Sequence, residues 1–216
     1  MKIPPRASPP TSQQADAIAV YSRLLDEART RLTAVGQTLG GATGLPDALV
    51  TEFSFLQFRM LCECVALCCL VAHGDIGATA SVKLQKEYAA DSILKKLELL
   101  HSNFFPHPVT MSSALNAHHI TKLEAGFLTK TDLISLYHEC GDRLHRGSLA
   151  KFRSSAPKAH LADPRRAHEL VKRFSVLLTL HHVASKSNLS HFICFLSHKQ
   201  TNGKAMVVLA QSPLPA

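Results

Sequence analysis

The sequence lacks the short motifs by which common nucleotide-binding folds hold phosphate groups. It contains neither the GxxxxGK[ST] phosphate loop nor the GxGxxG turn. It also shows no internal repeat, and no low-complexity tract outside its termini. The sequence therefore does not indicate a nucleotide hydrolase, and no cofactor is expected.

Disulfide and export signals are missing as well. No two of the six cysteines form a CxxC pair, and Cys62, Cys64, Cys68 and Cys69 crowd one stretch. Neighbours on one helix mostly point in different directions, so a disulfide framework is not expected. The N-terminal residues have no apolar run of the kind that a secretory signal needs. These features predict a cytoplasmic protein with reduced, buried thiols.

The composition is that of one ordinary globular domain. The chain has 216 residues, of which 46% are hydrophobic and 19% are charged. This length is enough to bury one core. We expect a disordered lead at residues 1–14, a single domain at 15–211 and a short tail at 212–216.

The longest apolar run, residues 53–72, approaches the length of a membrane span. It carries Gln57, Arg59 and Glu63 near its middle. A charge at the centre of a bilayer costs roughly 2.5–3.5 kcal/mol. We therefore predict a buried central helix and no membrane contact, because protein neighbours can satisfy these charges.

Apolar residues at spacings of three and four predict a mainly α protein, a bundle of about five helices with a C-terminal two-stranded β-hairpin. The expected helices are residues 15–35, 47–73, 91–101, 129–147 and 163–181. Thr129 and Asp163 are placed to cap the last two. Pro106 and Pro108 predict irregular chain at 102–111. Asn202-Gly203 predicts the hairpin at about 190–211, which must pack on the helices or pair with another chain.

Almost all of the net charge of +8 lies in one segment. Residues 143–173 hold nine basic and two acidic side chains, a net charge of +7. A clustered basic face is typical of a contact with RNA or another polyanion, and a solvated loop is the alternative. The residues predicted to bind a polyanion are Lys151, Arg153, Lys158, Arg165, Arg166, Lys172 and Arg173.

The stretch YHECGDRLHRGSL, residues 137–149, opens this segment. His138, Gly141 and His145 fall on one helix face and could line a groove. His145 is then a general acid or base, and Arg143 or Arg146 holds a phosphate. Alternatively, the cations only favour the negative end of the helix dipole, by roughly 0.3–1 kcal/mol.

An earlier long apolar helix with Arg and Glu, followed by Tyr-x-x-Cys-Gly-Asp-x-Leu-His-Arg-Gly, resembles the HEPN superfamily of helical bundles. The resemblance covers roughly residues 15–184 and implies a metal-independent ribonuclease that acts as a homodimer. His145 matches the catalytic histidine of that motif. Active members carry an Arg a few residues ahead of this histidine, and here those positions are occupied by His138, Glu139 and Cys140. The alternative is therefore an inactive binding or scaffold module, with the hairpin as an edge for a protein partner.

Other interpretations of the same residues stay open. Arg59 and Glu63 could pair with Asp142 or Arg143 in a buried network that fixes the helix register. Cys140 could act as a nucleophile, with burial as a small core residue the favoured alternative. A zinc site built from Cys62 or Cys69 and a distant histidine is a further alternative, but no metal is expected.

Overall fold

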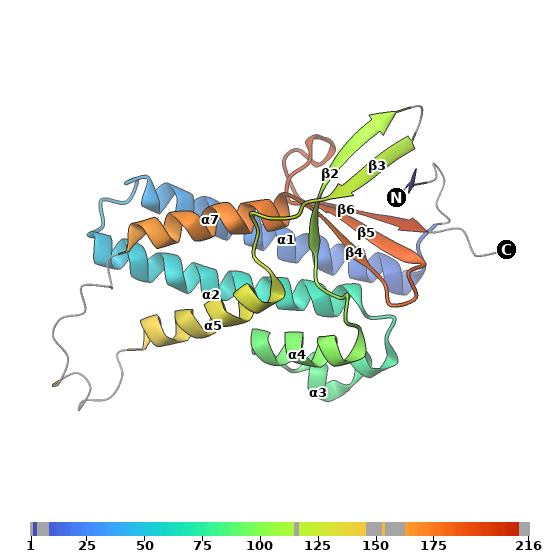
Figure 1. The fold of residues 1–216 in the computed structure, drawn as a ribbon, viewed down its shortest axis with the longest axis horizontal. Coiled ribbons are helices and arrows are strands. Elements are labelled where there is room, and N and C mark those ends of the chain that lie inside the picture. Colours follow the sequence, from blue (N-terminus) through green and yellow to red (C-terminus); the bar gives the residue numbers. More distant parts are fainter. Residues whose placement is uncertain (1, 4–8, 115–116, 146–152, 154–162, 212–216) are drawn as a thin grey trace.

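The structure, a computed structural model, describes residues 2–3, 9–114, 117–145, 153 and 163–211. Helices and an antiparallel sheet share one hydrophobic core (Figure 1). Within the described residues the α-helices are α1 (Ser12–Leu39), α2 (Asp47–Ala72), α3 (Val82–Gln85), α4 (Ala90–Leu100), α5 (Lys130–Leu144) and α7 (Pro164–Thr179). The short 3-10 helices η1 (Gly77–Ala80) and η3 (Lys199–Thr201) lie in connections.

The helices begin where capping residues place them. Thr129 accepts a hydrogen bond from the backbone N–H of Asp132, and the Asp132 side chain accepts from the N–H of Thr129, a complete capping box. Asp163 caps α7, which has proline at its first position. The predicted helices at 47–73 and 91–101 are confirmed, and so are the predicted starts of the two helices capped by Thr129 and Asp163. The first helix begins three residues earlier than predicted, at Ser12, and continues past its predicted end at residue 35 to Leu39.

Within the part of the chain that the structure describes, a six-stranded antiparallel sheet completes the fold, in the order β1, β3, β2, β4, β5, β6. Its strands are β1 (Lys2–Ile3), β2 (His107–Ala114), β3 (Ala117–Lys122), β4 (Leu180–Ala184), β5 (Ser190–Phe195) and β6 (Met206–Gln211). β2 pairs with β3 from Val109 onward, but with β4 only through His107 and Pro108. Figure 1 shows the β2–β3 hairpin standing out from the helices, while β4, β5 and β6 lie close to α1 and α7.

The prediction of a mainly α bundle with only a two-stranded hairpin is wrong, because the fold is mixed α/β. The predicted hairpin exists as β5 and β6, and Asn202 and Gly203 both have positive φ in its connection. β5 also pairs with β4 along its length. A third strand and the helices thus supply the support that an isolated hairpin lacks.

Two strands occupy positions where we predicted irregular chain and helix. Pro108 is incompatible with a helix but fits β2, because it stands near the strand's start, before pairing with β3 begins at Val109. Apolar spacing predicted helix up to His181, yet Leu180 already begins β4. The conformation of these residues is decided by their pairing with β5, which follows later in the chain, and not by their own apolar spacing.

The N-terminal segment that we expected to be disordered contributes to two elements. β1 pairs with His118 and His119 of β3. α1 takes up the last three residues of this segment. Residues 4–8 lie outside the described part of the chain.

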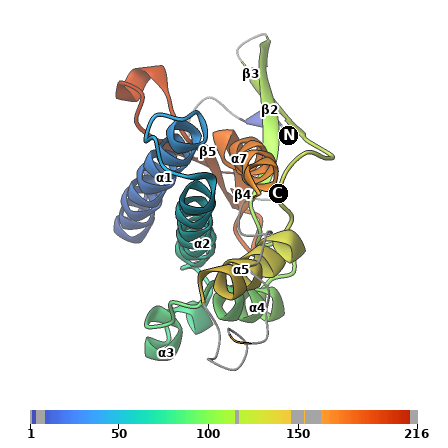
Figure 2. The same ribbon diagram turned by 90° about the vertical axis from the view of Figure 1, so that its left-hand side faces the viewer.

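α2 forms the centre of the core, with α1 on one side and α5 on the other (Figure 2). Phe55, Phe58 and Leu61 on this helix are fully buried. Among the described residues α2 is the only helix long and apolar enough to cross a membrane, and 61% of its most apolar window is buried inside the protein. The prediction of a buried central helix is confirmed.

Two polar contacts tie α1 to the end of the chain. The Tyr21 hydroxyl lies 2.9 Å from Nε2 of His181 in β4, and both side chains are buried. The backbone N–H of Ala205, just before β6, donates to Asp26 at 2.9 Å. The first helix is thus fixed by residues about 160 to 180 positions further along the chain.

Candidate functional site

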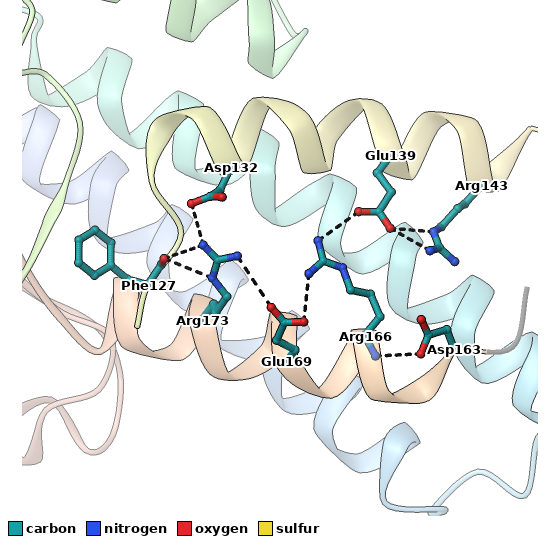
Figure 3. A network of polar contacts seen from close by, with 8 residues as sticks. All are labelled: Phe127, Asp132, Glu139, Arg143, Asp163, Arg166, Glu169 and Arg173. Carbon is teal, nitrogen blue, oxygen red and sulfur yellow. Dashed lines mark hydrogen bonds and ion pairs between the residues drawn. The ribbon is translucent and has the colours of Figure 1, made fainter. Parts of the chain in front are cut away.

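The basic segment begins on the last turn of α5 and continues along α7, and ion pairs join these two helices (Figure 3). Carboxylates and guanidinium groups alternate along the contact. The order is Asp132, Arg173, Glu169, Arg166, Glu139 and Arg143. We call these six residues the α5–α7 network. In it three positive charges meet three negative charges, so the network is close to neutral.

At one end of the network, Arg173 anchors the start of α5. Its Nη2 donates to Asp132 Oδ2 at 2.7 Å and to the carbonyl oxygen of Phe127 at 2.9 Å. Burial raises the pKa of Asp132, but hydrogen bonds from Thr129 and the charge of Arg173 outweigh this effect, and the pKa is lowered overall. Asp132 therefore stays ionised while it serves both the capping box and the contact with α7.

At the other end, Glu139 holds two arginines. Its Oε1 accepts from Arg143 at 2.9 Å, and its Oε2 lies 3.3 Å from Arg166 Nη2. Arg166 also donates to Glu169 at 3.1 Å. Burial lowers the pKa of Arg166, but the bonds to Glu169 and Glu139 raise it overall. The Arg143 guanidinium further lies 4.2 Å from the centre of the Phe55 ring, so its cation also packs on the core.

The network divides the predicted polyanion-binding residues into two groups. Arg166 and Arg173 are engaged within the fold. Arg153, Arg165 and Lys172 are exposed, and no carboxylate in the described part of the chain forms an ion pair with them. Lys151 and Lys158, and Arg146 of the predicted catalytic set, lie outside the described residues.

The predicted catalytic histidines are not brought together. His145 is the exposed C-cap of α5, and its backbone N–H donates to the Gly141 carbonyl. His138 stands two turns earlier, about 10 Å along the helix axis. Its Nε2 lies 3.6 Å from Asp91 of α4, and 58% of its side chain is exposed. The imidazole of His138 thus lies against α4, two turns before the end of α5 where His145 stands.

Gly141 makes room for a side chain of the protein itself. A methyl group built there would lie 3.5 Å from Nη1 of Arg59, which reaches across from α2. Arg59 Nη2 donates to the Tyr137 hydroxyl at 2.8 Å, and the guanidinium lies 4.3 Å from the centre of that ring. Arg59 thus occupies the position beside Gly141 where we expected a groove.

Arg59 lies in a polar network, as one hypothesis held, but its partner on α5 differs from the two that we expected. Arg59 Nε lies 3.6 Å from Glu63 Oε1, but its partner on α5 is Tyr137. Burial raises the pKa of Glu63, and the charge of Arg59 opposes that effect only in part. Asp142 is exposed and forms no ion pair with the described residues, while Arg143 belongs to the α5–α7 network.

The cysteines are all free and buried, as predicted. Burial, and next to it the charge of Glu139, raises the pKa of the Cys140 thiol to about 12. A thiol with such a pKa carries very little thiolate near neutral pH, which argues against a nucleophile there. Within the ranges that the structure describes, no group of three or more His, Cys, Asp or Glu side chains could hold a metal ion.

The carboxylates of the network, Asp132, Glu139 and Glu169, are not among the residues predicted for the site. Glu139 and Arg143 are four residues apart, and so are Glu169 and Arg173, a spacing that favours ion pairs on one helix. That signal was present in the sequence. The link from Glu139 to Arg166 spans two helices and had no local signal.

Comparison with known proteins adds no relative. No protein-family model, no curated protein and no solved structure matches the chain.

Proposed function

We propose that this protein binds a polyanion, RNA in the first instance, through the connection between α5 and α7 together with the exposed face of α7. The observation that carries the proposal is the division of the basic segment by the α5–α7 network. The arginines of the network already have carboxylate partners. The remaining cations of the segment are concentrated between the two helices and on α7.

The charge of this connection supports the proposal. Residues 146–162 contain four basic side chains, Arg146, Lys151, Arg153 and Lys158, and no acidic one. Arg165 and Lys172 add two exposed cations on α7. Clustered cations neutralise phosphates, which releases counterions and favours binding. The alternative is a binding or scaffold module that contacts only proteins.

Fluorescence polarisation with a labelled single-stranded RNA over a salt series tests the proposal. The test variant replaces Arg146, Lys151, Arg153 and Lys158 by Gln. The matched control replaces Lys83, Lys86, Lys186 and Lys199, four exposed lysines elsewhere, and lowers the net charge by the same amount.

The wild-type protein and the control should bind with affinity that falls steeply with salt. The test variant should bind weakly, and the slope of log affinity against log salt should drop by roughly 3, since each contact contributes about 0.7 on a single strand. Equal binding by the two variants, or binding that is indifferent to salt, would overturn the proposal.

A second candidate function is metal-independent cleavage of RNA. The observation that favours it is the position of His145, exposed at the end of α5 where the cationic connection begins. Arg146, the next residue in the sequence, would hold the phosphate, because Arg143 is paired with Glu139, and His145 would transfer a proton. In EDTA, His145→Ala should abolish cleavage, while His168→Ala, an exposed histidine on α7, should leave it intact. No cleavage by the wild-type protein, or equal cleavage by His145→Ala, rules this candidate out.

A further inference from the structure

One face of α2 is apolar and is not covered by the described part of the chain. Leu49 and Leu56 are 46% and 45% exposed, and Phe53 and Met60 are half-buried beside them. These four residues recur at spacings of four, three and four. That alternation forms the contact face of helices that pack knobs into holes. We call Leu49, Phe53, Leu56 and Met60 the α2 stripe.

Polar contacts mark the two borders of this stripe. On one side Arg31 of α1 donates to Gln57 of α2 at 2.7 Å. On the other side Arg59 of α2 donates to Tyr137 of α5 at 2.8 Å. The stripe therefore runs between the lines along which α2 meets α1 and α5, the two helices on either side of it in Figure 2.

The border of the stripe that faces α5 carries one acidic and one basic side chain. Glu52 and Arg59 are seven residues apart, so they lie two turns from each other on the same border. Both are partly exposed. Two copies of such a helix can pack antiparallel. The acid of each copy then lies beside the base of the other copy.

We propose that the α2 stripe is the interface of a homodimer in which α2 packs antiparallel against the same helix of a second copy. Antiparallel pairing about a two-fold axis sets Phe53 opposite the partner's Leu56, and Leu49 opposite the partner's Met60. Each of these contacts occurs twice, because a two-fold interface uses the same patch on both copies. The apolar side chains that water now contacts are thereby buried.

The same register brings Glu52 beside the partner's Arg59, again twice. A parallel pairing would lose this complementarity and would set Glu63 against the partner's Glu63. Like charges in contact are unfavourable, so the charges favour the antiparallel arrangement. This interface uses none of the residues proposed to bind the polyanion, and the two proposals can fail separately.

Analytical ultracentrifugation over a dilution series tests the interface. The wild-type protein should sediment as a dimer that dissociates on dilution. Leu56→Glu should be a folded monomer by circular dichroism and sedimentation. Leu99→Glu is the matched control, because Leu99 is 87% exposed on α4, away from the stripe, and this variant should stay dimeric. A wild-type monomer at every concentration, or a dimer that survives Leu56→Glu, overturns the proposal.

The register is tested by mixing two charge variants. Glu52→Lys alone and Arg59→Glu alone should each dimerise at least about tenfold more weakly than the wild-type protein, because like charges then meet twice. Their mixture should form a heterodimer of near wild-type affinity, in which Lys faces Glu at both contacts. A mixture that stays as weak as its components refutes the antiparallel register. If Arg59→Glu does not fold, Glu52→Lys decides, and unchanged dimerisation of that variant refutes the register.

Discussion

Lowering the pH from about 7 to about 5 should destabilise the fold through one buried imidazole, that of His181. This side chain is fully buried in β4. Its Nδ1 lies 3.2 Å from the Leu178 carbonyl, to which it donates, and its Nε2 accepts from the Tyr21 hydroxyl at 2.9 Å. Both nitrogens are satisfied in the neutral form, and a second proton would place a positive charge in a site that is closed to water.

The size of the effect follows from the pKa. Burial lowers the pKa of His181 to about 4; the bond to Leu178 opposes this shift and the charge of His182 adds to it. In the unfolded chain the pKa is about 6.5. Because the folded-state pKa is the lower one, the unfolded chain binds the proton first. Stability is fully present above about pH 6.5 and is lost as the pH falls toward 4. The loss is about 2 kcal/mol at pH 5.

Urea unfolding at the two pH values, followed by circular dichroism, measures this loss. Other histidines also have lowered pKa values, His182 among them, so the contribution of His181 is isolated by substitution. His181→Gln retains an acceptor for Tyr21 but cannot titrate, and should lose about 2 kcal/mol less stability than the wild-type protein between the two pH values. His119→Gln, an exposed histidine on β3, should behave like the wild type. Equal losses for all three proteins would refute the reasoning.

Two further changes probe the helices around the site. Gly141→Ala should raise the free energy of unfolding by up to about 1 kcal/mol in urea titrations, because alanine favours helix and its methyl group meets Arg59 at an ordinary contact distance; a loss of stability would indicate that this position needs an open space. Glu139→Gln should lower the free energy of unfolding by about 1 kcal/mol at low salt and by less at high salt, because two arginines lose their shared carboxylate. Asp142→Asn, on the same helix and without an ion pair to the described residues, is its control and should change nothing.

The helices could be predicted from the sequence because their signals are local. A Thr or Asp cap followed by apolar residues at spacings of three and four marks a helix whatever packs against it. β4 could not be predicted in this way. The residues after Thr179 continue the helical spacing, and only pairing with β5 turns them into a strand.

For the candidate site, too, the local features could be predicted from the sequence and the contacts between helices could not. The concentration of positive charge in residues 143–173 is a property of the sequence and needs no fold. Which of these cations are available depends on Glu139 and Asp132, carboxylates that reach across from another helix. Pairings of this kind depend on how helices cross, and no spacing rule for a single helix contains that information.

The contacts of α1 with the end of the chain have a consequence for synthesis. Tyr21 is made early, but His181 follows 160 residues later, and Ala205, the partner of Asp26, later still. A ribosome adds about 5–20 residues per second. The side of the first helix that packs on α7 and β6 therefore waits for many seconds before these partners emerge. In that interval it is exposed to chaperones and to other nascent chains, and any truncation before α7 leaves it without those partners.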